Sequence, residues 1–265
     1  MMNIIFPFLP VRSAKPRDTG LTMMMDKGLS VSETEHFIAA AGDYTDLVKL
    51  AFGTGVFVKN IDDKIRLYKE AGIRAYFGGT MFEAFIVRGL FDEFRRFIDR
   101  YRVEVCEVSD GSIALPHEEK LEYIRVLAGD VTVLSEVGSK IRGVVLNADQ
   151  WVDSMKTELQ AGSWKVIAEA RESGTIGIFR ADGTANKRLI DQLGKEVGNN
   201  HILWEAPNKN QQTWFIKKYG ANVNIGNVAS AEIVSLETLR LGLRSDTFFE
   251  FLPETMQQYK QTPEN

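Results

Sequence analysis

Charged and amide side chains follow each of five apolar runs in this 265-residue chain. The runs are VEVCEVSD (103–110), TVLSEVGSK (132–140), WKVIAEAR (164–171), ILWEAP (202–207) and ANVNIGN (221–227). Carboxylates hold oxygen-preferring metal ions, and lysine or carboxyl groups transfer protons. Strands that finish in such groups are typical of an enzyme whose chemistry lies at the carboxyl ends of a parallel sheet.

Alternation along the runs indicates that the charges share one side of the predicted strands, because successive strand residues point to opposite faces. Each charge has an apolar residue on its own face: Lys49 with Leu47, Glu107 with Val105, Glu136 with Leu134, Glu169 and Arg171 with Ile167, and Glu205 with Leu203. Any one charge could instead face a helix or a loop. Five strands with the same layout favour convergence at one site.

The order of predicted elements indicates a single closed α/β domain. Strands are expected at 22–27, 46–53, 73–79, 103–109, 131–137, 164–171, 202–206 and 221–226. Helical spacing of apolar residues alternates with them at 32–41, 60–71, 81–101, 116–128, 149–161, 184–197, 209–219 and 232–242. Eight strand–helix units predict a parallel sheet closed into a (β/α)8 TIM barrel. We expect the barrel to span residues 1–253, followed by a polar tail, 254–265.

Composition excludes several classes of protein. The net charge of −4 and the pI of about 5.6 argue against a protein that binds nucleic acid through phosphate contacts. No apolar run approaches the roughly 20 residues that cross a bilayer, so we expect no membrane partner. A single cysteine, Cys106, excludes an internal disulfide and fits a cytoplasmic setting.

Several carboxylates around one opening repel one another unless a cation lies among them. Mg²⁺ is one candidate, because it prefers oxygen ligands. The cationic side chains Lys27, Lys49, Lys140 and Arg171 are the others. Zinc is not expected, because the three histidines are scattered along the chain.

Nine stretches together resemble the phosphosulfolactate synthase family. They are KPRDTGLTMMMDKGL (15–29), KLAFGTG (49–55), YFGGTMFE (76–83), EVSDG (107–111), EVGSK (136–140), EARESGTIGIF (169–179), EAPNKNQQTWFI (205–216), GANVNIGNV (220–228) and LETLRLGLRSDT (236–247). They extend across almost the whole chain and coincide with the predicted active-site ends of the strands. The resemblance is therefore far more specific than any one short motif.

The resemblance implies a Mg²⁺-dependent enzyme that adds sulfite to C3 of phosphoenolpyruvate and gives (2R)-phospho-3-sulfolactate. In this family the product leads to coenzyme M in methanogens and to sulfolactate in spore-forming bacteria. The sequence does not select between these routes.

That chemistry suggests roles for individual residues. We expect Lys140 to donate a proton to C2, with Glu136 keeping its ammonium charged and Lys49 or Lys27 as rival donors. The predicted metal ligands are Glu107, Asp110, Glu169 and Glu205, supported by the nearby charge of Glu136. The predicted substrate-binding residues are Lys15, Arg17, Lys27, Arg171, Asn224, Gly226 and Asn227.

Two other functions stay open at this stage. A barrel aldolase or lyase acting on phosphoenolpyruvate or a keto acid could use the same lysines to form a Schiff base. A non-catalytic role through protein partners is the second, because plant heat-stress-associated proteins are similar to this family. We also expect a homo-oligomer, because the phenylalanine-rich helix predicted at 81–101 is more apolar than one barrel layer needs.

Overall fold

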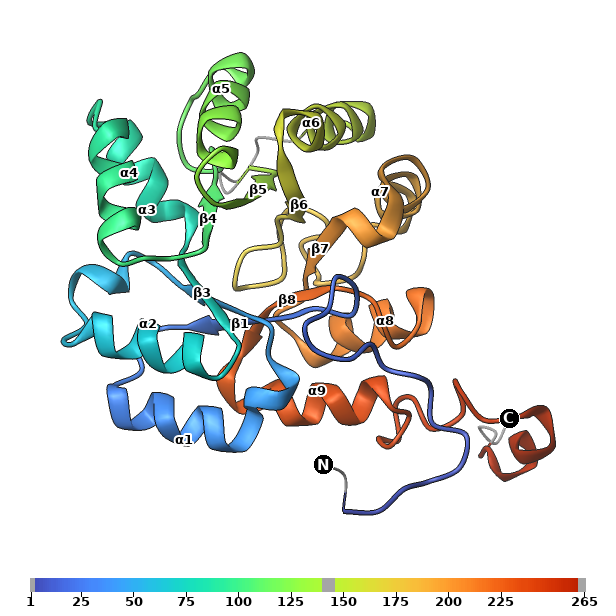
Figure 1. The fold of residues 1–265 in the computed structure, drawn as a ribbon. Helices are drawn as coiled ribbons and strands as arrows, with labels where there is room; N and C mark the ends of the chain where they lie inside the picture. Colours follow the sequence, from blue (N-terminus) through green and yellow to red (C-terminus); the bar gives the residue numbers. More distant parts are fainter. Residues whose placement is uncertain (1–2, 140–145, 262–265) are drawn as a thin grey trace.

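The computed structural model describes residues 3–139 and 146–261, and these form one α/β barrel (Figure 1). All paired strands run parallel, in the order β3-β2-β1-β8-β7-β6-β5-β4. Strand β3 lies beside β4 at the remaining seam and nearly closes the ring. The strands are β1 (Thr22–Asp26), β2 (Leu47–Leu50), β3 (Arg74–Phe77), β4 (Val105–Val108), β5 (Thr132–Val137), β6 (Ser163–Ala168), β7 (Ile202–Glu205) and β8 (Ile225–Ala229). The predicted (β/α)8 fold is confirmed.

Helices surround this sheet as an outer layer (Figure 1). They are α1 (Val31–Ala41), α2 (Ile61–Glu70), α3 (Gly79–Ile86), α4 (Phe91–Arg100), α5 (His117–Ala128), α6 (Ala148–Ala161), α7 (Lys187–Leu193), α8 (Lys209–Tyr219) and α9 (Ile233–Arg240). Within the described ranges, no helix combines the length and the apolar character needed to cross a membrane.

Two apolar layers position the strands. The inside of the barrel is filled by one buried set of side chains: Leu21, Met23, Leu47, Tyr76, Val105, Leu134, Ile167 and Leu203. The other strand face packs against the helices, where Val48, Cys106 and Trp204 are buried. The inward set has the parity expected from the sequence. Each charge two positions further along these strands therefore lies at the carboxyl end of the barrel interior.

Strand β8 begins four residues later than predicted, at Ile225 rather than 221. The preceding residues are held in a turn, where Asn224 Oδ1 accepts the Leu21 N–H at 3.1 Å and takes the place of a strand partner. Apolar alternation continues through this turn, so the sequence pattern does not mark where pairing starts. The shift moves Asn224 from the carboxyl end of the strand to its amino end.

The phenylalanine-rich region is two helices, α3 and α4, separated by a turn in which Gly89 has φ +68°. Its rings pack inside the protein: Phe82 and Phe94 are buried with ring centroids 5.3 Å apart, and Phe85, Phe91 and Phe97 pack against the same core. These contacts remove the reason for expecting a subunit contact at 81–101. The homo-oligomer itself stays a prediction.

Exposed apolar side chains gather instead near the two chain ends. Phe6 and Phe8 lie with Phe248 and Tyr259 around an apolar groove beside the barrel. The end predicted as a polar tail includes a 3-10 turn, Glu254–Tyr259, in this groove. The boundary at residue 253 stays a prediction.

Candidate active site

A cavity of about 500 Å³ opens at the carboxyl ends of the strands. Its lining comes from all eight strands or the segments that directly follow them. The lining residues are Met25, Lys49, Ala51, Phe52, Gly78, Gly79, Thr80, Glu107, Ser112, Glu136, Glu169, Arg171, Glu172, Ser173, Glu205 and Asn227. The predicted convergence of Lys49, Glu107, Glu136, Glu169, Arg171 and Glu205 is therefore confirmed by position.

Lys49 lies at the centre of the charged floor. Its Nζ is 3.0 Å from a Glu107 oxygen, 3.2 Å from Glu205 and 3.4 Å from Glu136. Burial lowers the pKa of an ammonium group, but Glu107, Glu205 and Glu136 outweigh burial and raise the pKa of Lys49 well above its ordinary value. Lys49 therefore stays charged and connects its own strand, β2, with β4, β5 and β7.

Three buried carboxylates, Glu136, Glu169 and Glu205, form a cluster. One oxygen from each lies within 4.8 Å of the others. Such an all-oxygen donor set fits a hard divalent cation such as Mg²⁺. Glu169 and Glu205, both predicted as metal ligands, belong to this cluster, and Glu136, predicted as a partner of Lys140, completes it.

Glu107 lies beside the cluster and caps a helix. One oxygen accepts the N–H of Gly79 at 2.6 Å, at the start of α3, while the other contacts Lys49. A carboxylate at a helix N-terminus is stabilised by the unpaired N–H groups there. A side chain in place of Gly79 would overlap Glu107 and Ser109, so only glycine lets the helix approach this closely.

Among the described residues that line the cavity, three other than glycine have left-handed backbone: Phe52 (φ +56°), Arg171 (φ +51°) and Asn227 (φ +58°). This conformation is costly for side chains and often occurs at functional sites. Asn227 is buried, and its Oδ1 has no hydrogen-bond partner among the described residues. A buried amide that lines a cavity in this way is suited to bind a ligand.

The loop after β6 is held over the cavity by α8. Gln211 Nε2 donates to the carbonyl oxygens of Gly174 (2.8 Å) and Gly183 (3.2 Å), and Asn208 Nδ2 donates to Ser173 (3.3 Å). These contacts fix the backbone that carries Arg171 to the cavity. Sequence reasoning assigned Gln211 no role, because nothing local marks the distant carbonyl groups that it binds.

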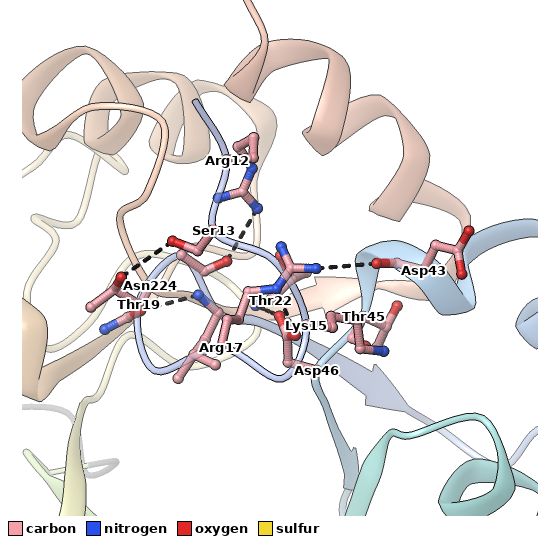
Figure 2. A network of polar contacts seen from close by, with 12 residues as sticks. Arg12, Ser13, Lys15, Arg17, Thr19, Thr22, Asp43, Thr45, Asp46 and Asn224 are labelled. Carbon is pink, nitrogen blue, oxygen red and sulfur yellow. Dashed lines mark hydrogen bonds and ion pairs between the residues drawn. The ribbon is translucent and has the colours of Figure 1, made fainter. Parts of the chain in front are cut away.

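Lys15 and Arg17 belong to a polar network beside the amino end of β2 (Figure 2), whereas the cavity opens at the carboxyl ends of the strands. Lys15 Nζ donates to the carbonyl oxygens of Gly42 (3.0 Å) and Thr45 (2.6 Å), just before β2. Arg17 pairs with Asp46 at 3.0 Å in the same place. The expectation that these cations contact substrate is not supported by position, because neither lines the cavity and both bind groups near residues 42–46.

The prediction that Asn224, Gly226 and Asn227 bind substrate together is not supported by their positions for all three residues. Asn224 lies before β8, where its Nδ2 donates to the carbonyl oxygens of Asn200 (3.2 Å) and Ile202 (3.1 Å). Gly226 lies within β8 and is packed against Met23. Neither residue lines the cavity, and Asn227 is the member of this trio that does.

Asp110 and Lys27 lie outside the cavity lining. Asp110 pairs with the buried Lys120 at 2.8 Å, away from the carboxylate cluster, so its expected role as a metal ligand is not supported by position. Lys27 pairs with Glu172 at the rim and lies 6.0 Å from the ring centroid of Phe52. Lys140 is outside the described residues, so its predicted role stays a prediction.

Several cavity residues were not predicted. Ser112, Glu172 and Ser173 come from loops and Thr80 from the first turn of α3, where no strand alternation indicates direction. Ser109 is buried directly after β4 and contacts Glu136, although it does not itself line the cavity. Ser109 is two residues after Glu107, so strand alternation would have placed it on the same face as Glu107.

Comparisons with known proteins identify the family of this chain. The family model for (2R)-phospho-3-sulfolactate synthase matches residues 10–246. The phosphosulfolactate synthase of Bacillus subtilis is 40% identical, covering 94% of this chain and all of the relative. That of Methanocaldococcus jannaschii is 41% identical, covering 86% of this chain and 94% of the relative. Protein HEAT-STRESS-ASSOCIATED 32 of Arabidopsis thaliana is more distant, at 23% identity over 86% of this chain and 88% of its own.

Solved structures support the fold alone. The chain superposes on 3-hexulose-6-phosphate synthase from Salmonella typhimurium with a TM-score of 0.53, covering 84% of this chain and all of that one, at 13% identity. A shared barrel at this identity carries no information about the reaction. The family match over residues 10–246 and the two synthases at about 40% identity are specific evidence, and they show that this chain belongs to the phosphosulfolactate synthase family.

Proposed function

We propose that this enzyme adds sulfite to C3 of phosphoenolpyruvate with Mg²⁺ held by Glu136, Glu169 and Glu205. The observation that carries the proposal is the cluster of three buried carboxylates in the cavity of a phosphosulfolactate synthase family member. The donor set fits the metal, because all three ligands are oxygens and the cavity leaves room for water and substrate.

The charge of the cavity supports a metal requirement. Among its described lining residues, five carboxylates face two cationic side chains, Lys49 and Arg171. Lys49 is already within 3.4 Å of three of those carboxylates. Phosphoenolpyruvate and sulfite are both anionic, so they would be repelled from this cavity without an added cation.

The reaction forms a carbon–sulfur bond at C3 and places negative charge on C2 and the adjacent carboxylate, after which a proton is added at C2. When bound, the divalent cation would supply positive charge beside that carboxylate. Arg171 would bind an anionic group of the substrate through its planar guanidinium. The amide of Asn227 would contact the substrate from the β8 side of the cavity.

The proton donor in this proposal is Lys140. It follows β5 after Gly138, whose φ of +126° gives the chain a sharp turn at the rim. Lys49 is the less suitable donor, because three carboxylates surround its ammonium and hold it in the floor of the cavity. The same surroundings disfavour Lys49 as a Schiff-base lysine, since imine formation needs a neutral, accessible amine.

A direct assay tests the proposal. Protein is incubated with phosphoenolpyruvate, sulfite and Mg²⁺, and phosphosulfolactate is measured by mass spectrometry. Activity should disappear after chelation with EDTA and return with Mg²⁺. Glu169→Gln should lose most activity at ordinary Mg²⁺ concentration, because it removes one charge from the cluster. Product formation that survives exhaustive chelation would refute the metal requirement.

Borohydride trapping separates this chemistry from that of an aldolase. Sulfite addition needs no imine, so treatment with pyruvate and borohydride should leave the protein mass unchanged. A stable adduct on a lysine would instead favour the aldolase. A protein that makes no product under any of these conditions would favour the partner-binding role suggested by the plant relative.

A further inference from the structure

The three clustered carboxylates are oriented by different kinds of group. Glu205 accepts the backbone N–H of Ala170 at 3.0 Å, and Glu169 accepts the backbone N–H of Arg171. Glu136 Oε1 instead lies 2.8 Å from the hydroxyl oxygen of Ser109. Backbone amides are fixed by the fold, whereas a hydroxyl can be removed by substitution. The orientation of Glu136 is therefore the one that mutation can test most directly.

Ser109 is fully buried directly after β4 and is not among the residues that line the cavity. Its hydroxyl oxygen is 2.7 Å from Glu83 Oε1 as well as 2.8 Å from Glu136 Oε1. One hydroxyl carries one proton, so it donates to one carboxylate at a time. Which carboxylate receives it depends on the other donors around the pair.

Backbone N–H groups of the loop after β4 bind both Glu83 and Ser109. Glu83, on α3, also accepts the N–H of Ser112 at 3.2 Å. The oxygen of Ser109 accepts the N–H of Gly111 at 3.4 Å. The loop after β4 thus holds both Glu83 and Ser109 in place, with the Ser109 hydroxyl oxygen within hydrogen-bond distance of Glu136.

The backbone of Glu136 is also fixed by a hydrogen bond from a buried lysine. Lys120 Nζ donates to the Glu136 carbonyl oxygen at 2.7 Å, and Lys120 is held by Glu158 at 2.8 Å. The main chain and one carboxylate oxygen of Glu136 are therefore both fixed by groups outside the cavity. The second carboxylate oxygen faces Lys49.

We propose that Ser109 is a positioning residue for the metal site: its hydroxyl fixes the Glu136 carboxylate in the orientation that completes the three-carboxylate cluster. This inference rests on the proposed Mg²⁺ site. Groups that orient metal ligands commonly change metal affinity about 10- to 100-fold when they are removed. Ser109 touches neither the cavity nor the proposed reacting atoms, so its effect acts through Glu136.

The test measures metal binding without substrate. Mg²⁺ affinity is measured by titration calorimetry, and Mn²⁺ affinity by electron paramagnetic resonance of free Mn²⁺. Ser109→Ala should raise both Kd values about 10-fold or more. Saturating Mg²⁺ should restore much of kcat, a recovery that a general loss of structure would not give. Ser109→Cys keeps nearly the same volume with a weaker donor, so it should show an intermediate Kd and serves if the alanine variant does not fold.

Ser163→Ala is the matched control. Ser163 is also a buried barrel serine, but its hydroxyl bonds to Ser135 at 2.8 Å, away from the cavity. Its Kd for Mg²⁺ should equal that of the wild type.

Wild-type Kd values in folded Ser109→Ala and Ser109→Cys proteins would overturn the role of Ser109 and leave the metal site intact. A wild-type protein that binds neither metal would overturn the proposed site and this inference with it.

Discussion

The two ends of this barrel use the same kinds of side chain for different purposes. At the carboxyl end, Lys49 and Asn227 line a cavity together with a cluster of glutamates. At the amino end, Lys15, Arg17 and Asn224 bind backbone carbonyl groups and Asp46, in the network of Figure 2. Residue type therefore does not distinguish a functional cation from a structural one in this fold.

The two ends of the barrel differ in whether their buried side-chain amides have hydrogen-bond partners within the protein. Both atoms of the Asn224 amide have protein partners, whereas Oδ1 of Asn227 is buried without one in the described part of the chain. Buried polar groups normally have partners, so an unmatched one beside a cavity indicates a ligand. Substitution should consequently affect stability at the amino end and activity at the carboxyl end.

The largest expected effect is at Lys140, which follows β5 and lies outside the described residues. Lys140→Ala should lower kcat by about 10²–10⁴-fold and leave the fold intact, because a proton donor contributes on that scale. Lys140→Arg should recover little activity, since guanidinium is too weak an acid. The measurement is kcat at saturating substrate. A raised KM with kcat near that of the wild type would limit Lys140 to substrate binding.

At the amino end, Arg17→Ala should lower the free energy of unfolding by about 3 kcal/mol, because it leaves the buried Asp46 carboxylate without its charged partner. Its kcat should stay within about twofold of wild type at a temperature where the variant is folded. Urea denaturation followed by circular dichroism measures the stability. The double variant Arg17→Ala/Asp46→Asn should recover part of the lost stability. A lower kcat in Arg17→Ala without loss of stability would instead indicate that Arg17 acts in the active site.

The two asparagines provide a matched pair. Asn224→Ala should cost about 1–3 kcal/mol of stability, because it leaves the Leu21 N–H and two carbonyl groups without their partner, and should leave KM unchanged. Asn227→Ala should raise KM several-fold with little loss of stability. Thermal melts and steady-state kinetics on both proteins decide the matter. The reverse pattern would refute the division between the two ends.

The smallest effect is expected at Lys27, whose ion pair with Glu172 joins two loops at the rim of the cavity. Both side chains are about half exposed, and such pairs contribute roughly 0–1 kcal/mol. Lys27→Ala should change stability by less than about 1 kcal/mol and leave kcat close to wild type. A fall in kcat of about 100-fold would instead make Lys27 a proton donor.

The sequence by itself determined the barrel and most of the cavity floor. Strand alternation has a period of two, and this local rule predicted that Lys49, Glu107, Glu136, Glu169 and Glu205 would converge. The rule needs no knowledge of distant contacts, because the parity within each strand and the closure of eight units together fix which side chains point inward.

Only the tertiary structure decided which end of the barrel the remaining charges occupy. Lys15 and Arg17 lie in a segment without regular periodicity, and its path is set by carbonyl groups and a carboxylate near residues 42–46. Asn224 lies at the amino end of β8 rather than at the predicted carboxyl end, because pairing of β8 with β1 and β7 begins at Ile225. Each of these placements depends on partners far away in the chain, and local patterns carry no information about them.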